Sequence, residues 1–179
     1  MSTTQQQDYK INRREFLQRT GALIPISTLG LSSNASAIVN STSQEKKITI
    51  KNVDSNFERE PLNPYRFKGS AITEAWQVAS RLEGESGAAS IGLATQNILW
   101  SDSKVFAAHS QSGGNALMYA MTERALELLK GSSFTNPMQL LDDMLPEVYA
   151  YGKRITNNAD LRKTFALNAL VSVDNAAWL

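Results

Sequence analysis

The sequence predicts an α+β domain in which a three-stranded antiparallel sheet is followed by a small helical bundle. Downstream of residue 46, apolar side chains first alternate with polar ones, which is the period of a β-strand. From residue 117 onward they recur every three or four residues, which is the period of an α-helix. A run of strands followed by a run of helices is typical of the α+β class.

The strands are expected in the first part of this domain. Residues 48–57 place apolar side chains among polar ones and favour an edge-like strand, whereas the prolines of 60–70 favour a loop. Residues 75–83 alternate clearly and predict the second strand. A glycine-containing turn at 83–87 then leads into a short apolar run, 90–94, and this spacing predicts an antiparallel hairpin. The expected buried face of the second strand is Trp76, Val78, Ser80 and Leu82.

Three helices are expected after the strands. The first should end at Gly131, which suits a left-handed cap, and the second should start at Asn136 with Pro137 in its first turn. Pro146 is expected to split the second helix, and the third should begin at Asp160. The expected buried positions are Leu117, Met121, Ala125 and Leu128, then Met138, Leu141, Leu145 and Val148, and finally Leu161, Phe165, Ala169, Leu170, Val173 and Ala177.

Composition excludes several classes of function. The 179 residues carry a formal net charge of +1, which gives no field that would attract nucleic acid. The chain has no cysteine, so disulfides, thiolate metal sites and a cysteine nucleophile are excluded. His109 is the single histidine, and with no nucleophile-elbow sequence a hydrolase triad is disfavoured. Asp142, Asp143 and Glu147 favour an exposed acidic helix face over a metal site.

Residues 1–37 are interpreted as a twin-arginine signal peptide. Arg-Arg-x-Phe-Leu precedes the weakly apolar run 21–31, which at about 11 residues is too short to cross a bilayer core of about 30 Å as a helix. Residues 38–45 are interpreted as a flexible linker and 46–179 as the folded domain. The expected location is therefore the periplasm, reached through the Tat translocase. The signal residues are Arg13, Arg14, Phe16 and Leu17, and the cleavage site is formed by Ala35 and Ala37.

The end of the chain resembles a known family. Asp174, Ala176 and Trp178 fill the positions of the Asp-x-Ala-x-Trp stretch with which enolase-superfamily enzymes pass from their N-terminal capping domain into their barrel. Residues 91–94 resemble the Gly-x-Gly-Glu-Ala strand of the mandelate racemase and muconate-lactonizing branch. The usual Glu of that strand is absent, and Leu179 stands where members commonly have Asp. We expect 46–179 to be such a capping domain, truncated at the barrel junction.

The resemblance implies chemistry that lies outside this chain. In these enzymes Mg²⁺, held by three carboxylates of the barrel, stabilises an enediolate while a Lys or His moves the proton next to a substrate carboxylate. The complete protein is expected to be a racemase, epimerase, dehydratase or cycloisomerase of a small carboxylate. No catalytic, cofactor or metal residue is expected in this chain, and the sequence leaves open whether the protein is a homo-oligomer.

Two loops of such a capping domain close the barrel mouth and select the substrate. By order along the chain they are 62–73 and 96–105. A cationic side chain in these loops would bind a substrate carboxylate, and an aromatic ring would line the pocket. Each candidate residue taken singly is equally compatible with a merely structural role. The expected substrate-binding residues are Arg66, Phe67, Lys68 and Trp100.

A second interpretation belongs to another functional class. The chain would then be a complete, small exported binding or interaction domain without catalysis. This alternative predicts that 38–179 is a soluble monomer that unfolds cooperatively. The capping-domain interpretation predicts aggregation or poor cooperativity, because the last helix would expose an apolar face meant for the barrel.

Overall fold

The computed structural model describes residues 47–67 and 69–178, which belong to one unit of the chain, Ser43–Leu179. Within these ranges no helix combines the length and the apolar character that a membrane crossing requires. The predicted linker 38–45 lies outside the described residues, and so does Leu179 at the other end of the sequence. So do several residues of the predicted sites, namely Arg13, Arg14, Phe16, Leu17, Ala35, Ala37 and Lys68.

The sheet is antiparallel throughout, and its strand order is β3-β2-β1-β4. The first three strands, β1 (Ile48–Phe67), β2 (Ser70–Gly84) and β3 (Ala89–Gln96), follow one another as the sequence predicts. A fourth strand of two residues, β4 (Ser133–Phe134), pairs with the start of β1. The α+β class is thus confirmed, with one short strand beyond the predicted sheet.

The predicted loop at 60–70 is wrong, because β1 continues to Phe67 and β2 begins at Ser70. Tyr65 and Phe67 pair with Ile72 and Ser70. The prolines of this stretch do not end the strand, since they coincide with a shift of register between Pro61 and Tyr65. At such an irregularity a missing backbone N–H removes no regular ladder bond. The result is a long two-stranded arm.

The helices are α2 (Ile98–Ser101), α3 (Ser103–Leu129), α4 (Pro137–Ile155) and α5 (Lys163–Trp178). Two predicted boundaries are confirmed: Gly131 has φ +80° just after the end of α3, and the Asn136 side chain accepts a hydrogen bond from the amide of Met138. Pro146 lies inside α4 without splitting it, and α5 begins at Lys163 and not at Asp160.

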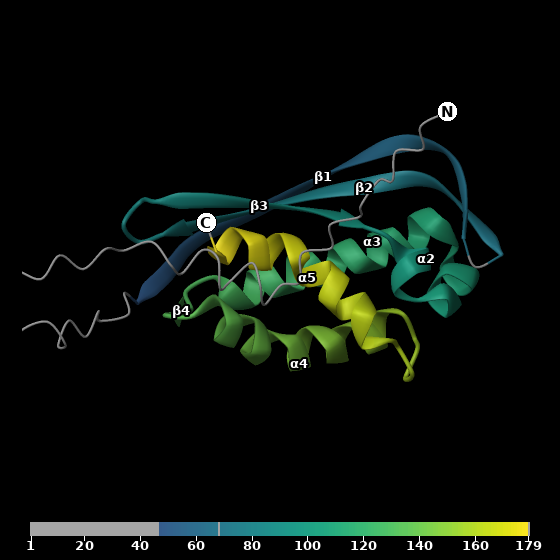
Figure 1. Ribbon diagram of the computed structural model, residues 1–179. Helices are drawn as coiled ribbons and strands as arrows, with labels where there is room; N and C mark the ends of the chain where they lie inside the picture. Colours follow the sequence, from purple (N-terminus) through teal and green to yellow (C-terminus); the bar gives the residue numbers. More distant parts are fainter. Residues whose placement is uncertain (1–46, 68, 179) are drawn as a thin grey trace, which may run out of the picture. The chain divides into compact units, whose positions relative to one another are not determined.

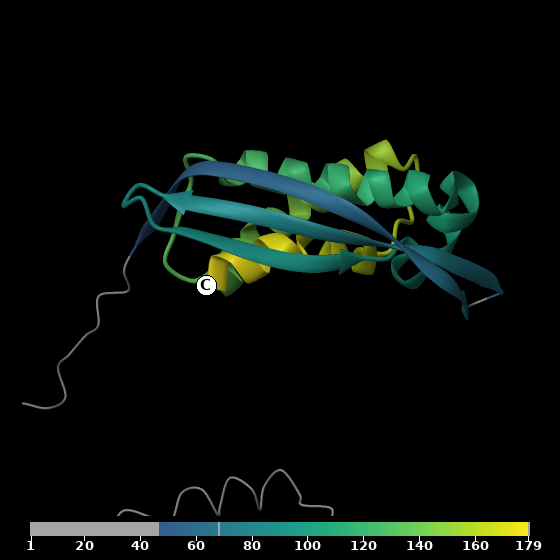
Figure 2. The same cartoon turned by 90° about the horizontal axis from the view of Figure 1, so that it is seen from above.

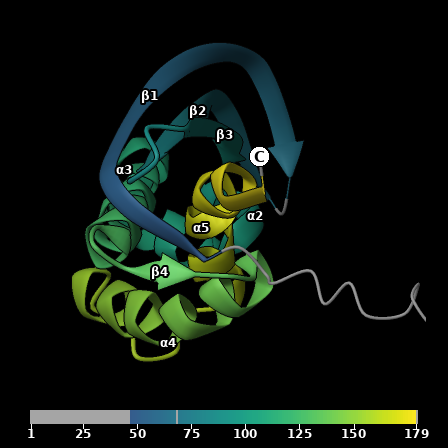
Figure 3. The same cartoon turned by 90° about the vertical axis from the view of Figure 1, so that its left-hand side faces the viewer.

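The helices form two layers on one face of the sheet (Figures 1 and 2). The first layer holds α3 and α5, which lie side by side and contact the strands, with α5 along the edge strand β3. The second layer is α4, which contacts α3 and α5. Seen end-on in Figure 3, β1 curves round α3 and α5 and brings its first residues to β4.

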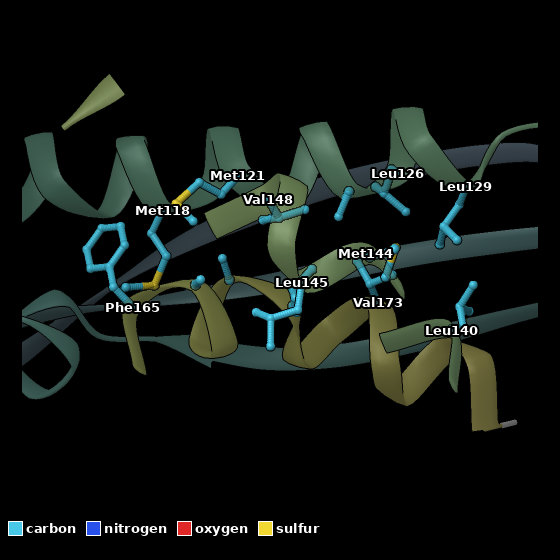
Figure 4. Close-up of a cluster of buried hydrophobic side chains, with 14 of the residues drawn as sticks. Met118, Met121, Leu126, Leu129, Leu140, Met144, Leu145, Val148, Phe165 and Val173 are labelled. Atoms are coloured by element: carbon cyan, nitrogen blue, oxygen red, sulfur yellow. The ribbon is translucent and has the colours of Figure 1, made fainter. Parts of the chain in front are cut away.

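The hydrophobic core lies between these layers, and Figure 4 shows side chains from α3, α4 and α5 meeting there. The predicted face of β2 is confirmed, since all of its predicted residues are buried. On α4 the predicted register is wrong at its first position, because Met138 is 60% exposed whereas Leu140 and Met144 are buried. The labelled core residues are Met118, Met121, Leu126, Leu129, Leu140, Met144, Leu145, Val148, Phe165 and Val173.

Candidate functional site

Two of the predicted substrate-binding residues meet at one end of the sheet. The rings of Phe67, at the end of β1, and Trp100, on α2, stack with their centroids 5.1 Å apart and their planes inclined by 22°. Phe67 is half-buried, whereas Trp100 is 66% exposed. The structure therefore joins two segments that are far apart in the sequence into one aromatic surface.

The residues that directly precede Phe67 on β1 are exposed. Arg66 is exposed on β1 directly before Phe67, and Tyr65 is 61% exposed. Lys68, the remaining predicted residue, lies outside the described residues. In general, a guanidinium can bind a carboxylate and aromatic rings can cover the apolar part of a small molecule.

The predicted loop 96–105 is wrong, because it contains α2 and the beginning of α3. The chain turns helical here since two polar side chains cap successive helices. The Asn97 side chain accepts a hydrogen bond from the amide of Trp100, 3.1 Å away, and Asp102 caps α3. Ile98 and Leu99 are fully buried under the turn. Trp100 is thus presented from a fixed, one-turn helix.

The side chain of Asp102 is fully buried, and its hydrogen bonds link α2, α3 and α5. Oδ1 accepts hydrogen bonds from two amides in the first turn of α3, and Oδ2 accepts one from the amide of Arg162, 2.9 Å away, just before α5. Backbone donors satisfy a buried carboxylate without a partner cation. Asp102 is therefore a structural residue, and both of its oxygens are occupied.

A second polar cluster ties the base of the β1–β2 arm to α3. Glu74 on β2 accepts hydrogen bonds from the Arg59 guanidinium, the Trp76 indole and the Ser112 hydroxyl, at 2.7, 2.9 and 2.7 Å. Beside it, the Gln111 amide donates to the carbonyl of Glu74, 2.7 Å away. These contacts join β1, β2 and the middle of α3 at one point.

Electrostatics keep the Glu74 carboxyl ionised. Burial disfavours its charged form and on its own would raise the pKa. The hydrogen bonds from Trp76, Arg59 and Ser112, together with the charge of Arg59, outweigh that effect and hold the pKa of Glu74 below its usual value. Sequence reasoning missed this residue, because nothing in the pattern around Glu74 indicates that Ser112 will lie next to it.

The other polar residues considered in the sequence lie on α3 and α4. His109 Nε2 lies 3.2 Å from the carbonyl oxygen of Thr156, at the end of α4. Asp142 and Asp143 are exposed, and Glu147 pairs with Arg124. Across residues 47–67 and 69–178, no group of three or more acidic or histidine side chains is arranged to hold a metal ion.

Comparison with known proteins finds similar solved structures only. No family model matches the chain, and no match is found among curated proteins. A mandelate racemase/muconate lactonizing protein from Herpetosiphon aurantiacus is 18% identical, with 72% of this chain and 29% of that chain covered and a TM-score of 0.40.

Two further structures are similar over a comparable part. The dipeptide epimerase from Enterococcus faecalis, complexed with Mg and a dipeptide, is 16% identical over 73% of this chain and 30% of that chain, with a TM-score of 0.42. The L-talarate/galactarate dehydratase from Salmonella typhimurium is 16% identical over 88% and 34% of the two chains, with a TM-score of 0.46. The chain thus spans about a third of the length of the structures it matches.

Proposed function

We propose that this chain is the capping domain of an exported enzyme of the mandelate racemase and muconate-lactonizing type. The observation that carries the proposal is the stack of Phe67 on Trp100, 5.1 Å apart. These residues belong to the two segments that the family resemblance assigns to the barrel mouth. Their meeting at one end of the sheet is what a domain that closes a single pocket requires.

The last helix supports the proposal independently. Leu167 and Val171 are each 37% exposed and Trp178 is 57% exposed, and their spacing places them on one face of α5. The indole of Trp178 donates to Asp174, 3.2 Å away, so the residues that carry the family resemblance also contact one another. An apolar helix face beside the domain's edge strand suits a surface that a barrel covers.

In the proposed enzyme this domain binds and encloses the substrate. Arg66 would meet a substrate carboxylate, and Phe67 and Trp100 would cover its apolar part and exclude water. The described residues do not fit a Mg²⁺ ion, so the metal and the groups that move the proton would belong to the barrel. The complete enzyme would accordingly racemise, epimerise, dehydrate or cycloisomerise a carboxylate-bearing small molecule.

Export through the twin-arginine pathway is part of the proposal, and it rests on the order of Arg13, Arg14, the apolar run and the Ala35–Ala37 site in the sequence. Fusing residues 1–45 to a fluorescent protein that folds in the cytoplasm tests it. We expect periplasmic fluorescence that is lost in the double variant Arg13→Lys, Arg14→Lys. Fluorescence that stays cytoplasmic in the unchanged fusion would contradict the proposal.

The enzymatic proposal is tested on the gene and then on its product. We expect the reading frame to continue into strands that carry a Lys-x-Lys pair and spaced Asp or Glu ligands, and the product to act on a carboxylate with Mg²⁺. Arg66→Gln should raise KM about tenfold or more, because a charged hydrogen bond contributes about 1.5–3 kcal/mol. Lys130→Gln, an exposed cation at the C-terminal end of α3, is the control. Equal effects of the two substitutions would argue against a substrate-binding role for Arg66.

A further inference from the structure

Asn168 on α5 bonds to the end of the edge strand β3. Its side chain is half-buried, and Nδ2 donates to the carbonyl oxygen of Thr95, 3.3 Å away. Oδ1 accepts a hydrogen bond from the amide of Asn97, 3.0 Å away. A residue of a parallel strand would bond to the two sides of Gln96 in the same way, because a side-chain amide carries the same kinds of donor and acceptor as the backbone. The bond to Thr95 fixes the direction of the amide group, so that Oδ1 faces α2.

The same oxygen contacts both ends of α2. Besides the amide of Asn97, which caps the start of α2, Oδ1 of Asn168 accepts a hydrogen bond from the hydroxyl of Ser101 at its end, 3.0 Å away. An amide oxygen has two lone pairs, which suits two donors. The Asn97 side chain in turn accepts a hydrogen bond from the amide of Trp100, so Asn168 is linked to Trp100 through a single residue.

Two other polar side chains hold α2 by different atoms. Asn115, buried on α3, accepts a hydrogen bond from the amide of Ile98, 3.1 Å away. Thr164 on α5 donates to the carbonyl oxygen of Ser101, 2.8 Å away. These contacts keep α2 folded against the core. Among these three side chains only that of Asn168 bonds to the residue that caps α2, so its loss should change the orientation of α2 without unfolding it.

We propose that Asn168 is a positioning residue, which sets the direction in which α2 presents Trp100 to the ring of Phe67. Because Trp100 is 66% exposed, the position of its ring follows that of its backbone. The inference rests on the proposed function, in which Trp100 covers part of a substrate. In the complete enzyme Asn168→Ala should therefore raise KM and leave kcat nearly unchanged, because the groups that move the proton would belong to the barrel.

Fluorine NMR of the full chain, 1–179, labelled with fluorotryptophan tests the position of Trp100 without any substrate. The label gives three signals, one for each tryptophan, and Trp100→Phe identifies that of Trp100. Phe67→Ala gives the signal of Trp100 without its stacked partner. We expect Asn168→Ala to move the signal of Trp100 by most of that difference. The signal of the buried Trp76 should move much less.

Asn175→Ala is the matched control. Asn175 lies about two turns further along α5, and its amide likewise donates to a carbonyl of β3, that of Leu93, 2.8 Å away. The control removes the same chemistry at a distance from α2, so the signal of Trp100 should stay in place. Asn168→Asp is the conservative variant. It keeps an oxygen for both donors of α2 and loses only the donor to Thr95, so the signal of Trp100 should stay close to its original position.

Each of four results would overturn the proposal. In the first, Asn168→Ala leaves the signal of Trp100 unchanged. In the second, Asn175→Ala moves that signal as far as Asn168→Ala does, and in the third, Asn168→Asp does so. In the fourth, all three signals of Asn168→Ala collapse together, which would mean that Asn168 maintains the whole fold. Because no substrate is present, a failure of the substrate-binding role of Trp100 would leave the outcome unchanged.

Discussion

Gly92 on β3 lies directly against the backbone of α5. A Cβ atom placed on Gly92 would come within 2.0 Å of the carbonyl oxygen of Ser172 and 2.3 Å of the amide nitrogen of Ala176. Next to it, the hydroxyl of Ser80 on β2 lies 2.8 Å from that of Ser172. The edge strand and the last helix therefore approach so closely that only glycine fits at this position.

Gly92→Ala should destabilise the domain by about 3 kcal/mol or more, because backbone atoms cannot turn away as a side chain can. Gly84→Ala is the matched control on β2, since its Cβ would meet its nearest atom, the carbonyl oxygen of Thr49, at an ordinary 3.6 Å. Urea unfolding followed by circular dichroism measures both variants. Equal stability of the two variants would show that α5 does not pack this closely on β3.

Asp102→Asn should cost about 2–3 kcal/mol of unfolding free energy. The amide group would turn an N–H toward one of the backbone donors that Asp102 now satisfies, and a buried charged hydrogen bond would be lost. Asp142→Asn is the matched control on an exposed surface and should stay within about 0.5 kcal/mol of the unchanged protein. Thermal unfolding of both variants at neutral pH tests the difference.

Sequence periodicity predicted the elements that are buried on one face. Trp76, Val78 and Leu82 alternate because one face of β2 covers the helices and the other faces solvent, so that burial is directly visible in the sequence. The Asn136-Pro137 pair likewise predicted the start of α4, because a cap and its first turn are local chemistry.

The candidate site was predictable only in part, because its geometry depends on contacts between distant segments. Phe67 and Trp100 were singled out by order along the chain, but the pairing that carries β1 past Pro61 and Pro64 is not encoded locally. Proline and exposed residues favour a loop by composition. The missed local signals were Asn97 and Asp102, whose positions before α2 and α3 suit N-caps.

The stability contributed by Glu74 should depend on pH. Its pKa in the folded state lies below that of the unfolded chain, so its contribution is fully present above the unfolded value, about 4.3, and is lost as the pH falls through the folded value. The difference in unfolding free energy between the unchanged protein and Glu74→Gln should therefore shrink on acidification. Exposed Glu60→Gln controls for the loss of one charge. A difference that stays constant from neutral pH to pH 3 would contradict the ionic role of Glu74.

Ser110 interrupts α3 with a backbone conformation that favours glycine. Its φ of 65° and ψ of 174° lie in a region that costs a residue with a side chain about 1–3 kcal/mol. Its hydroxyl oxygen partly offsets the strain, since it accepts a hydrogen bond from the amide of Gly113, 3.3 Å away. The break lies immediately before Gln111 and Ser112, which hold the base of the arm.

Ser110→Gly should therefore stabilise the domain by about 1 kcal/mol, since relief of strain exceeds both the lost hydrogen bond and the added flexibility of glycine in the unfolded chain. Ser110→Ala separates these effects, because it removes the hydroxyl and keeps the strain, and it should destabilise by about 0.5–1 kcal/mol. Urea unfolding with an unchanged m-value measures both variants. If Ser110→Gly is less stable than Ser110→Ala, the backbone at this break is not strained.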